Sequence, residues 1–576
     1  MAPSRLRLTV PIIVMALAWP AAAVPAQAAA PAQAPVPAVV VPSRAVAAAS
    51  AHTSSAQKAK VDRVRAPKIG WYKAKAWSYY LATVRLPLDY DHPHGATVQV
   101  ALAKIPAADP SRRIGTLFLN PGGPGGSGVQ LALQAPTFLS QDILDRFDIV
   151  GFDPRGTNYG TKVKCFSGYR SSTLTLQDLD GIPVGKAERR TYLRAAKKLA
   201  TGCSHHGRRI ASAMSTTEVA RDMDVLRRSV GDSRLTYLGF SYGTYLGEVY
   251  ASMFPDRFRA IALDGVIDPV AWRGSAKTAG VPMSLRLNAA EGAWKALSTA
   301  FALCKAAGPT YCELPDPMAT LKAVASELRG GSLETLFGTL SYSDLVSTLL
   351  DALYNQTYGP ETAVGLVAAT QDALTGGSDD EEFLFKLLKK VRASRSGFNF
   401  PYDNSTDAYS AVMCTDAAEP RKQSTWTKAI ARRSATAPYF AEAWGWSDAQ
   451  CARQYWTARD EDRYRGSFSK RTAKPVLLVG DYYDPATAYT GAVSTHKRMP
   501  NSWLITSDSW GHTAYGTSDC VTSQVDAYLL HGAKPSPQVC ESDYVPFSDP
   551  LVTTSAVKAT MTQAAASGMG PITAQG

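Results

Sequence analysis

Six short apolar runs, separated by helical patterns, constrain the fold of this chain more than any other feature. Each run is bounded by Gly, Asp or Pro, which is typical of strands buried on both faces of a parallel sheet. The segment 218–228 spaces Val219, Met223 and Leu226 on one helical face, and Thr216 or Thr217 is its predicted N-cap. Alternating strands and helices predict an α/β fold with a mostly parallel sheet. The runs are 115–119, 147–152, 235–238, 260–263, 476–479 and 503–505.

This alternation stops near Asp268-Pro269 and resumes near Lys474-Pro475. The residues between show a period of 3.6, which predicts helices over 288–305, 319–328, 343–353, 361–374 and 382–391. A helical block inserted before the last strands predicts a cap over the carboxyl edge of the sheet, where open α/β sheets bind ligands. We therefore assign 61–270 and 471–576 to the core and 271–470 to a helical cap.

The N-terminus has the pattern of an export signal. Basic Arg5 and Arg7 precede an apolar run over 8–23, and Ala26-Gln27-Ala28 follows as a small-residue cleavage site. Residues 1–28 are therefore a predicted signal peptide, and 29–60, rich in Ala and Pro, a predicted linker or pro-segment. No later stretch is apolar enough to span a bilayer. We expect a secreted, extracellular protein without membrane insertion.

Composition narrows the classes of partner. The net charge of +12 is compatible with attachment to anionic cell-wall polymers, but a solvated basic surface is the simpler explanation. Basic blocks interleaved with aromatics do not occur, which argues against nucleic acid. Eight cysteines in an exported chain favour disulfides, and the absence of C-x-x-C argues against zinc. We predict pairing between neighbours, 165–203, 304–312, 414–451 and 520–540; nothing indicates the oligomeric state.

The strongest local motif is G-x-S-x-G at Gly239–Gly243, directly after one strand-like run and directly before a helical pattern. A nucleophilic serine on a sharp strand-to-helix turn needs glycines two positions either side, because larger side chains would clash there. The turn would expose the Ser241 hydroxyl and direct the Tyr242 N–H toward a developing oxyanion. The motif therefore predicts Ser241 as a nucleophile.

A serine hydroxyl needs a base near neutral pH, and three histidines follow Ser241 in the chain. Only His512 lies on a Gly-containing loop directly after the last strand-like run, whereas His496 and His531 have the pattern of surface positions. The acid that orients the base should follow the preceding strand, where Asp481 and Asp484 compete. We favour Asp484, because it lies deeper in the loop and Asp481 could simply end the strand.

A glycine-dense loop, Asn120–Gly128, follows the strand-like run at 115–119. Such a loop lets main-chain N–H groups approach a substrate carbonyl and complete an oxyanion hole. The competing interpretation is a phosphate-binding loop. That interpretation is disfavoured, because the loop lacks the terminal Lys-Ser/Thr and its prolines remove donors. Chemistry of this kind requires no metal and no organic cofactor.

With these residues in place, the sequence resembles the secreted tripeptidyl aminopeptidases of actinobacteria, capped α/β-hydrolases related to proline iminopeptidases. The resemblance covers about 81–540 and rests on several motifs together, at 84–90, 120–125, 151–156, 237–244, 263–269, 414–416, 484–487 and 511–512. It implies an α/β-hydrolase fold with the triad Ser241, Asp484 and His512. It further implies an oxyanion hole of the Gly123 and Tyr242 N–H groups, and release of short peptides from free N-termini.

Two positions depart from the family pattern. Ala488 stands where a proline is usual, so the acid loop is expected to be looser, and no cysteine follows Trp71, so one disulfide of the usual set is expected to be missing. Action on N-termini also requires a carboxylate that pairs with the substrate ammonium. Asp416, Glu419 and Glu291 are the candidates, with Asp416 preferred. Asp153 and Arg155 are expected to brace the loops beside the oxyanion hole.

Three other functions remain open at this point. The same acyl-transfer groups would serve a secreted carboxylesterase or lipase, because they do not select the leaving group. A narrower cap would give an iminopeptidase that releases a single residue. A non-catalytic binding protein on the same fold is disfavoured by the order of nucleophile, acid, base and glycine loop.

Overall fold

The computed structural model of the chain describes residues 51–74, 78–335, 338–377, 384, 386 and 402–549. The predicted signal peptide and most of the predicted linker therefore lie outside the described residues. One ten-stranded sheet has the order β1-β2-β3-β5-β4-β6-β7-β10-β11-β12. From β5 to β12 all neighbouring strands in this order are parallel. The mostly parallel sheet of an α/β fold is confirmed.

All six predicted strands are present, and the structure extends most of them by a few residues. The antiparallel edge formed by β1, β2 and β3 was not predicted from the sequence. The strands are β1 (Tyr72–Lys73), β2 (Tyr80–Pro87), β3 (Thr97–Ile105), β4 (Gly115–Asn120), β5 (Phe147–Phe152), β6 (Leu235–Phe240), β7 (Phe258–Asp264), β10 (Val476–Tyr483), β11 (Ser502–Trp510) and β12 (Val539–Cys540).

Helices cover both faces of the sheet and bury two apolar clusters against it. One face carries α1 (Ser55–Val61), α7 (Thr216–Ser229), α8 (Tyr242–Met253) and α19 (Tyr489–Arg498); the other carries α2 (Gly128–Gln134), α3 (Gln141–Arg146) and α20 (Asp519–His531). The predicted helix at 218–228 is α7, but its N-cap is Ser215, whose hydroxyl accepts from the Glu218 N–H. The N-cap prediction of Thr216 or Thr217 was therefore wrong.

The described residues include the last part of the segment 29–60. Helix α1 packs against α7, and Lys60 pairs with Asp91 at 2.5 Å and with Asp462 at 2.8 Å. Thr53 also donates its N–H to the carboxylate of Asp256 at 3.1 Å. These contacts attach residues 53–60 to the core.

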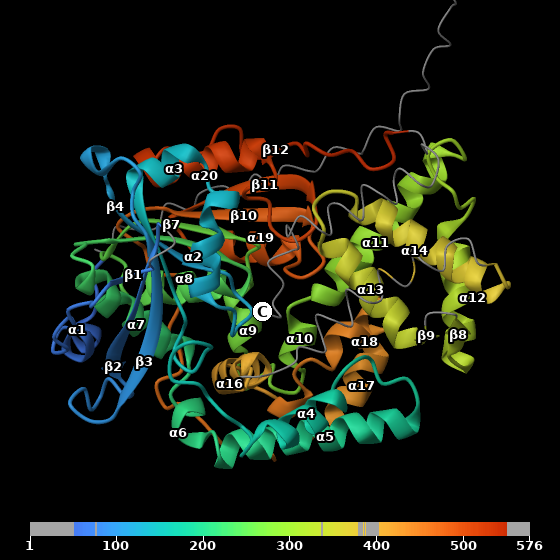
Figure 1. Cartoon of the computed structure of the whole chain (residues 1–576), viewed down its shortest axis with the longest axis horizontal. Helices are drawn as coiled ribbons and strands as arrows, with labels where there is room; N and C mark the ends of the chain where they lie inside the picture. Colours follow the sequence, from blue (N-terminus) through green and yellow to red (C-terminus); the bar gives the residue numbers. More distant parts are fainter. Residues whose placement is uncertain are drawn as a thin grey trace, which may run out of the picture.

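A block of helices lies beside the carboxyl edge of the sheet, on the right in Figure 1. Four of the five helices predicted there are present, and 382–391 lies outside the described residues except for 384 and 386. The block contains α9 (Pro269–Arg273), α10 (Met283–Arg286), α11 (Ala289–Ala307), α12 (Pro317–Gly330), the hairpin β8 (Leu333–Thr335) and β9 (Gly338–Leu340), α13 (Tyr342–Tyr354), α14 (Gly359–Leu374), α17 (Ser424–Arg433), α18 (Phe440–Gly445) and the 3₁₀ turn η3 (Ala449–Cys451).

A second segment completes this block. Helices α4 (Tyr169–Gln177), α5 (Lys186–His205) and α6 (Arg208–Ala211) follow β5, and α5 runs beneath the cap in Figure 1. The Tyr192 hydroxyl donates to Trp446 O at 2.9 Å, and the Gln423 amide donates to Leu193 O at 2.9 Å. Conversely, α16 (Ser405–Asp416) buries its apolar residues in the cluster shared with α7 and α8. Contacts therefore cross the predicted boundaries in both directions.

Four disulfides join neighbouring cysteines, as predicted: Cys165–Cys203, Cys304–Cys312, Cys414–Cys451 and Cys520–Cys540. Two of them fix loops and helices around the cap, since Cys203 lies on α5 and Cys414 on α16. Among the helices of the described part of the chain, none has both the length and the apolar character needed to cross a bilayer.

Candidate active site

Ser241 occupies the turn between β6 and α8, with φ 56° and ψ −123°. A side chain rarely adopts a positive φ unless its surroundings impose it. A Cβ on Gly239 would lie 2.6 Å from Gly243 O, and one on Gly243 would lie 2.8 Å from Asn120 Oδ1. Both glycines are therefore required by the close packing of the turn, as the motif predicted.

The glycine loop lies directly against this turn. A Cβ on Gly122 would be 2.8 Å from Ser241 Cβ and 2.9 Å from Tyr242 N, and Gly122 has φ 95°. Tyr242 begins α8, so its N–H has no acceptor within the helix. Gly122 thus keeps the space in front of the Tyr242 N–H open. This role of Gly122 was not predicted from the sequence, although the residue lies in the predicted loop.

Asp153 and Ser127 hold the far end of the same loop. The Ser127 hydroxyl donates to Asp153 at 2.6 Å, and the Tyr159 N–H donates to the other carboxylate oxygen at 2.9 Å. Arg155 is buried between Glu218 at 3.0 Å and Asp222 at 2.6 Å. Asp153 therefore braces the glycine loop, whereas Arg155 binds α7 to the core.

His512 and Asp484 are joined as the sequence predicted. The Asp484 oxygens lie 2.8 and 3.1 Å from His512 Nδ1. The same carboxylate accepts from the N–H groups of Ala486 and Thr487 and from the Thr487 hydroxyl, each at 2.7 Å. Burial alone would lower the pKa of His512, but the charge and hydrogen bond of Asp484, with a smaller contribution from Asp264, leave it raised.

Asp264 connects the serine turn to the histidine loop, a role that was not predicted from the sequence. Its main-chain oxygen accepts from the Ser241 N–H at 2.9 Å. Its Oδ2 accepts from the N–H groups of Ala514 and Tyr515 at 3.0 and 2.8 Å. Burial raises the pKa of Asp264 to about 6. Its position at the end of a predicted strand was the available signal, the same signal that indicated Asp484.

The competing residues occupy other environments. Asp481 is buried, and burial together with the nearby charges of Asp264 and Asp484 raises its pKa well above the usual range. His496 lies in α19, where its Nδ1 is 2.9 Å from the Ser502 hydroxyl, and His531 is exposed at the end of α20. Neither histidine contacts Asp484.

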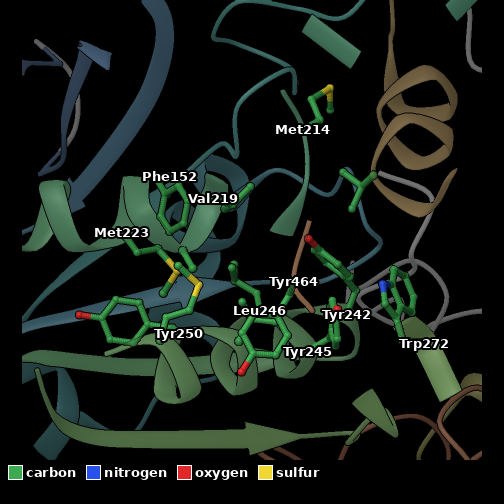
Figure 2. Packing of buried hydrophobic residues seen from close by; sticks show 14 of the residues in the cluster. Phe152, Met214, Val219, Met223, Tyr242, Tyr245, Leu246, Tyr250, Trp272 and Tyr464 are labelled. Carbon is green, nitrogen blue, oxygen red and sulfur yellow. The ribbon is translucent and has the colours of Figure 1, made fainter. Parts of the chain in front are cut away.

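A cavity lies between the sheet edge and the cap. Core residues Gly123, Ser241 and Thr487 line one side of it. Polar side chains in the lining besides the core residues are Asp268, Ser284 and Ser447. The cap contributes mainly apolar and aromatic side chains: Trp272, Met283, Leu287, Tyr354, Tyr409, Met413 and Trp444. Figure 2 shows Trp272 beside Tyr242 and Tyr245; its ring centroid is 5.2 Å from that of Tyr242. The cavity wall is therefore continuous with the buried core beneath the serine turn.

The three acidic residues predicted to bind a substrate ammonium do not line this cavity in the described part of the chain. Asp416 accepts the Thr216 N–H and hydroxyl, at 2.9 and 2.6 Å, and the Trp272 indole N–H at 3.2 Å. Both oxygens of Glu419 lie 3.3 Å from the Met283 N–H. Glu291 pairs with Arg433 and is partly exposed.

Within the described residues, two groups of side chains have the spacing of metal ligands, and neither lines the cavity. Cys165 and Cys203 of the first group form a disulfide. Asp91 and Asp462 of the second group are paired with Lys60. These pairings account for both groups without a metal ion.

Comparisons with known proteins agree with this geometry. The family described as "alpha/beta hydrolase fold" matches residues 115–278, and the family described as "TAP-like protein" matches residues 437–540. The sheet, the serine turn and the histidine loop together define a serine hydrolase of the α/β-hydrolase class.

Similarity to individual proteins assigns the chain to a narrower family within this class. It is 31% identical over 461 residues to the tripeptidyl aminopeptidase of Streptomyces coelicolor, covering 78% of this chain and 80% of the relative. It is 30% identical over 480 residues to serine protease Hip1 of Mycobacterium tuberculosis, covering 78% and 85%. It is also 30% identical over 479 residues to carboxylesterase B of the same organism, covering 79% and 84%. The chain belongs to the tripeptidyl aminopeptidase family of α/β-hydrolases.

Proposed function

We propose that this protein is a secreted exopeptidase that releases short peptides, chiefly tripeptides, from free N-termini through an acyl-enzyme on Ser241. The observation that carries the proposal is the hydrogen-bonded His512–Asp484 pair, whose loop Asp264 links to the turn of a strained serine that lines the cavity. Four disulfides and the export-like N-terminus support secretion.

In the proposed mechanism, His512 removes the proton of the Ser241 hydroxyl as the oxygen attacks the scissile carbonyl. The bond from His512 Nδ1 to Asp484 fixes the imidazole tautomer and stabilises the imidazolium. The Tyr242 and Gly123 N–H groups stabilise the oxyanion. His512 then protonates the leaving amine, and water attacks the acyl-enzyme by the same route, which releases the N-terminal fragment.

Among the acidic candidates, we propose that Glu419 binds the substrate ammonium. It lies directly behind Met283, which lines the cavity, and its bonds to the Met283 N–H are long. Burial raises the pKa of Glu419 well above its usual range. The Arg286 guanidinium lies 4.0 Å from Glu419, so an ammonium that entered this region would supply a closer charged partner than the carboxyl now has. Asp416 is a weaker candidate, since Thr216 and Trp272 already occupy its oxygens.

A carboxylesterase is the second candidate function. The cavity is lined mainly by apolar and aromatic side chains, and one relative of similar identity is named carboxylesterase B. An apolar cavity accepts the acyl part of an ester as readily as an apolar peptide side chain.

Mass spectrometry of the products from a decapeptide separates these functions. The proposal predicts release of the N-terminal tripeptide and loss of that release when the peptide is N-acetylated. Release of single residues would indicate an iminopeptidase. Rapid hydrolysis of a short acyl ester, with the decapeptide left intact, would contradict the peptidase proposal.

A further inference from the structure

We propose that Gln356, a residue of the cap, is a positioning residue for the catalytic base His512. The inference rests on the proposed function of His512 and concerns the main chain around that residue. It assigns part of the active-site geometry to the cap, in addition to the cap's contribution to the cavity wall.

The cap segment after α13 contacts both peptide groups of His512. The His512 N–H donates to Tyr354 O at 3.2 Å, and the Gln356 amide donates to His512 O at 2.8 Å. The same amide lies 3.5 Å from Thr513 O. The Tyr354 ring packs edge-on to the imidazole, with 5.2 Å between the ring centroids. Two hydrogen bonds and one ring contact therefore fix His512 from the cap side.

The histidine loop and the cap segment at residues 354–356 pack closely against each other. A Cβ on Gly511 would lie 2.8 Å from the main chain of Asn355 and of Gln356, and Gly511 has φ 88°. Thr513 also has a positive φ, 70°. The histidine loop thus adopts a backbone conformation that side chains rarely take, on both sides of His512, and the cap segment packs directly on it.

The core holds the same loop from the opposite side. Asp264 accepts the N–H groups of Ala514 and Tyr515, and Asp484 accepts from the imidazole. The core also holds Trp510, which pairs with Tyr483 across β10 and β11. Without the hydrogen bonds from the cap, the core would hold the loop at both ends and through the imidazole, but not through the peptide groups of His512. Because a misplacement of about 1 Å can lower a rate by about 10²-fold, the hydrogen bond from Gln356 is expected to affect catalysis.

The test compares Gln356→Met with Gln423→Met. Methionine keeps the length of the side chain and removes the amide donor. Gln423 offers a matched control, because its amide also donates to a main-chain oxygen, that of Leu193, at 2.9 Å, within the cap and away from His512. The readouts are kcat, KM and the pH dependence of kcat/KM on a peptidyl amide, together with the rate of labelling by a fluorophosphonate.

We expect Gln356→Met to lower kcat and the labelling rate by about 10- to 100-fold, with a smaller change in KM. The acid limb of its pH profile of kcat/KM should move to lower pH, because Asp484 stabilises the charged form of a loosely held imidazole less well. Gln423→Met should resemble the wild type in kcat, KM, the pH profile and the labelling rate.

Three outcomes would overturn the proposal: wild-type kcat in Gln356→Met, an equal loss in Gln423→Met, or a lower kcat with an unchanged acid limb. If Gln356→Met fails to fold, Gln356→Ala compared with Gln423→Ala provides the same test. A wild-type protein that neither labels nor cleaves peptides would contradict the proposed function instead, so the two failures are distinguishable.

Discussion

The hydrolase core and the cap reach the same cavity by different structural routes. In the core, Ser241, Asp484 and His512 each follow the carboxyl end of a parallel strand, β6, β10 or β11. The sheet brings these ends to one edge, so residues far apart in the chain meet there without special arrangement. The cap side chains in the cavity come mainly from helices that pack on one another. No regular hydrogen-bonded framework such as a sheet fixes where each of these side chains points. In the proposed mechanism the core therefore supplies the reacting groups, and the cap supplies most of the apolar surface of the cavity.

The largest expected effect distinguishes the two carboxylates at the end of β10. Asp484→Asn should lower kcat by about 10⁴-fold, because an amide at this position disfavours the tautomer of His512 that can accept a proton from serine. Asp481→Asn should lower kcat by less than about tenfold, since burial and the nearby carboxylates raise the pKa of Asp481 and disfavour its charged form, and an amide of the same shape replaces it. Steady-state kinetics on a peptidyl amide measures both. Equal losses in the two variants would show that the pair acts as a unit.

A smaller effect is expected in the cap. Glu419→Gln should raise KM for peptides with a free N-terminus by about 10- to 100-fold, the range expected for loss of a charged hydrogen-bond partner. Glu291→Gln, which removes one partner of a partly exposed ion pair, should change KM by less than about twofold. Measurements on free and N-acetylated peptides separate ammonium binding from general damage. A Glu419 variant with unchanged KM would favour Asp416 as the ammonium-binding residue.

The placement of Ser241, Asp484 and His512 at strand ends could be predicted from the sequence because the signals for it are local. A glycine two positions either side of Ser241, a strand before Asp484 and a loop glycine before His512 each lie within a few residues of the side chain concerned. Neighbour pairing of the cysteines was likewise predicted and is confirmed. These features depend on short-range geometry, which one sequence contains.

The features that were missed depend on contacts between distant segments. Asp416 pairs with Thr216, some 200 positions away, so its engagement with the core could not be predicted from either segment alone. Helix α5 joins the cap although it precedes β6 in the chain, because Tyr192 reaches Trp446. The edge strands β2 and β3 were missed because neither is a continuous apolar run, and both alternate between buried and exposed positions along part of their length.

The smallest expected effect concerns pH. Protonated His512 cannot act as a base, so kcat/KM should fall as the pH drops through the pKa of His512, which Asp484 and Asp264 raise. The acid limb should therefore lie above the usual value for an imidazole, about 6.5. Asp264→Asn keeps an oxygen for the Ala514 and Tyr515 N–H groups but removes the charge, so it should move the acid limb to lower pH. A limb that stays in place would show that Asp264 acts through geometry alone.

The most direct test of the account is to react the protein with a fluorophosphonate and locate the label by mass spectrometry. Because the proposed base His512 would activate one hydroxyl only, a single label is expected on Ser241. Labelling should be abolished in Ser241→Ala and slowed severely in Asp484→Asn. A folded wild-type protein that remained unlabelled, or that carried the label on another residue, would contradict it.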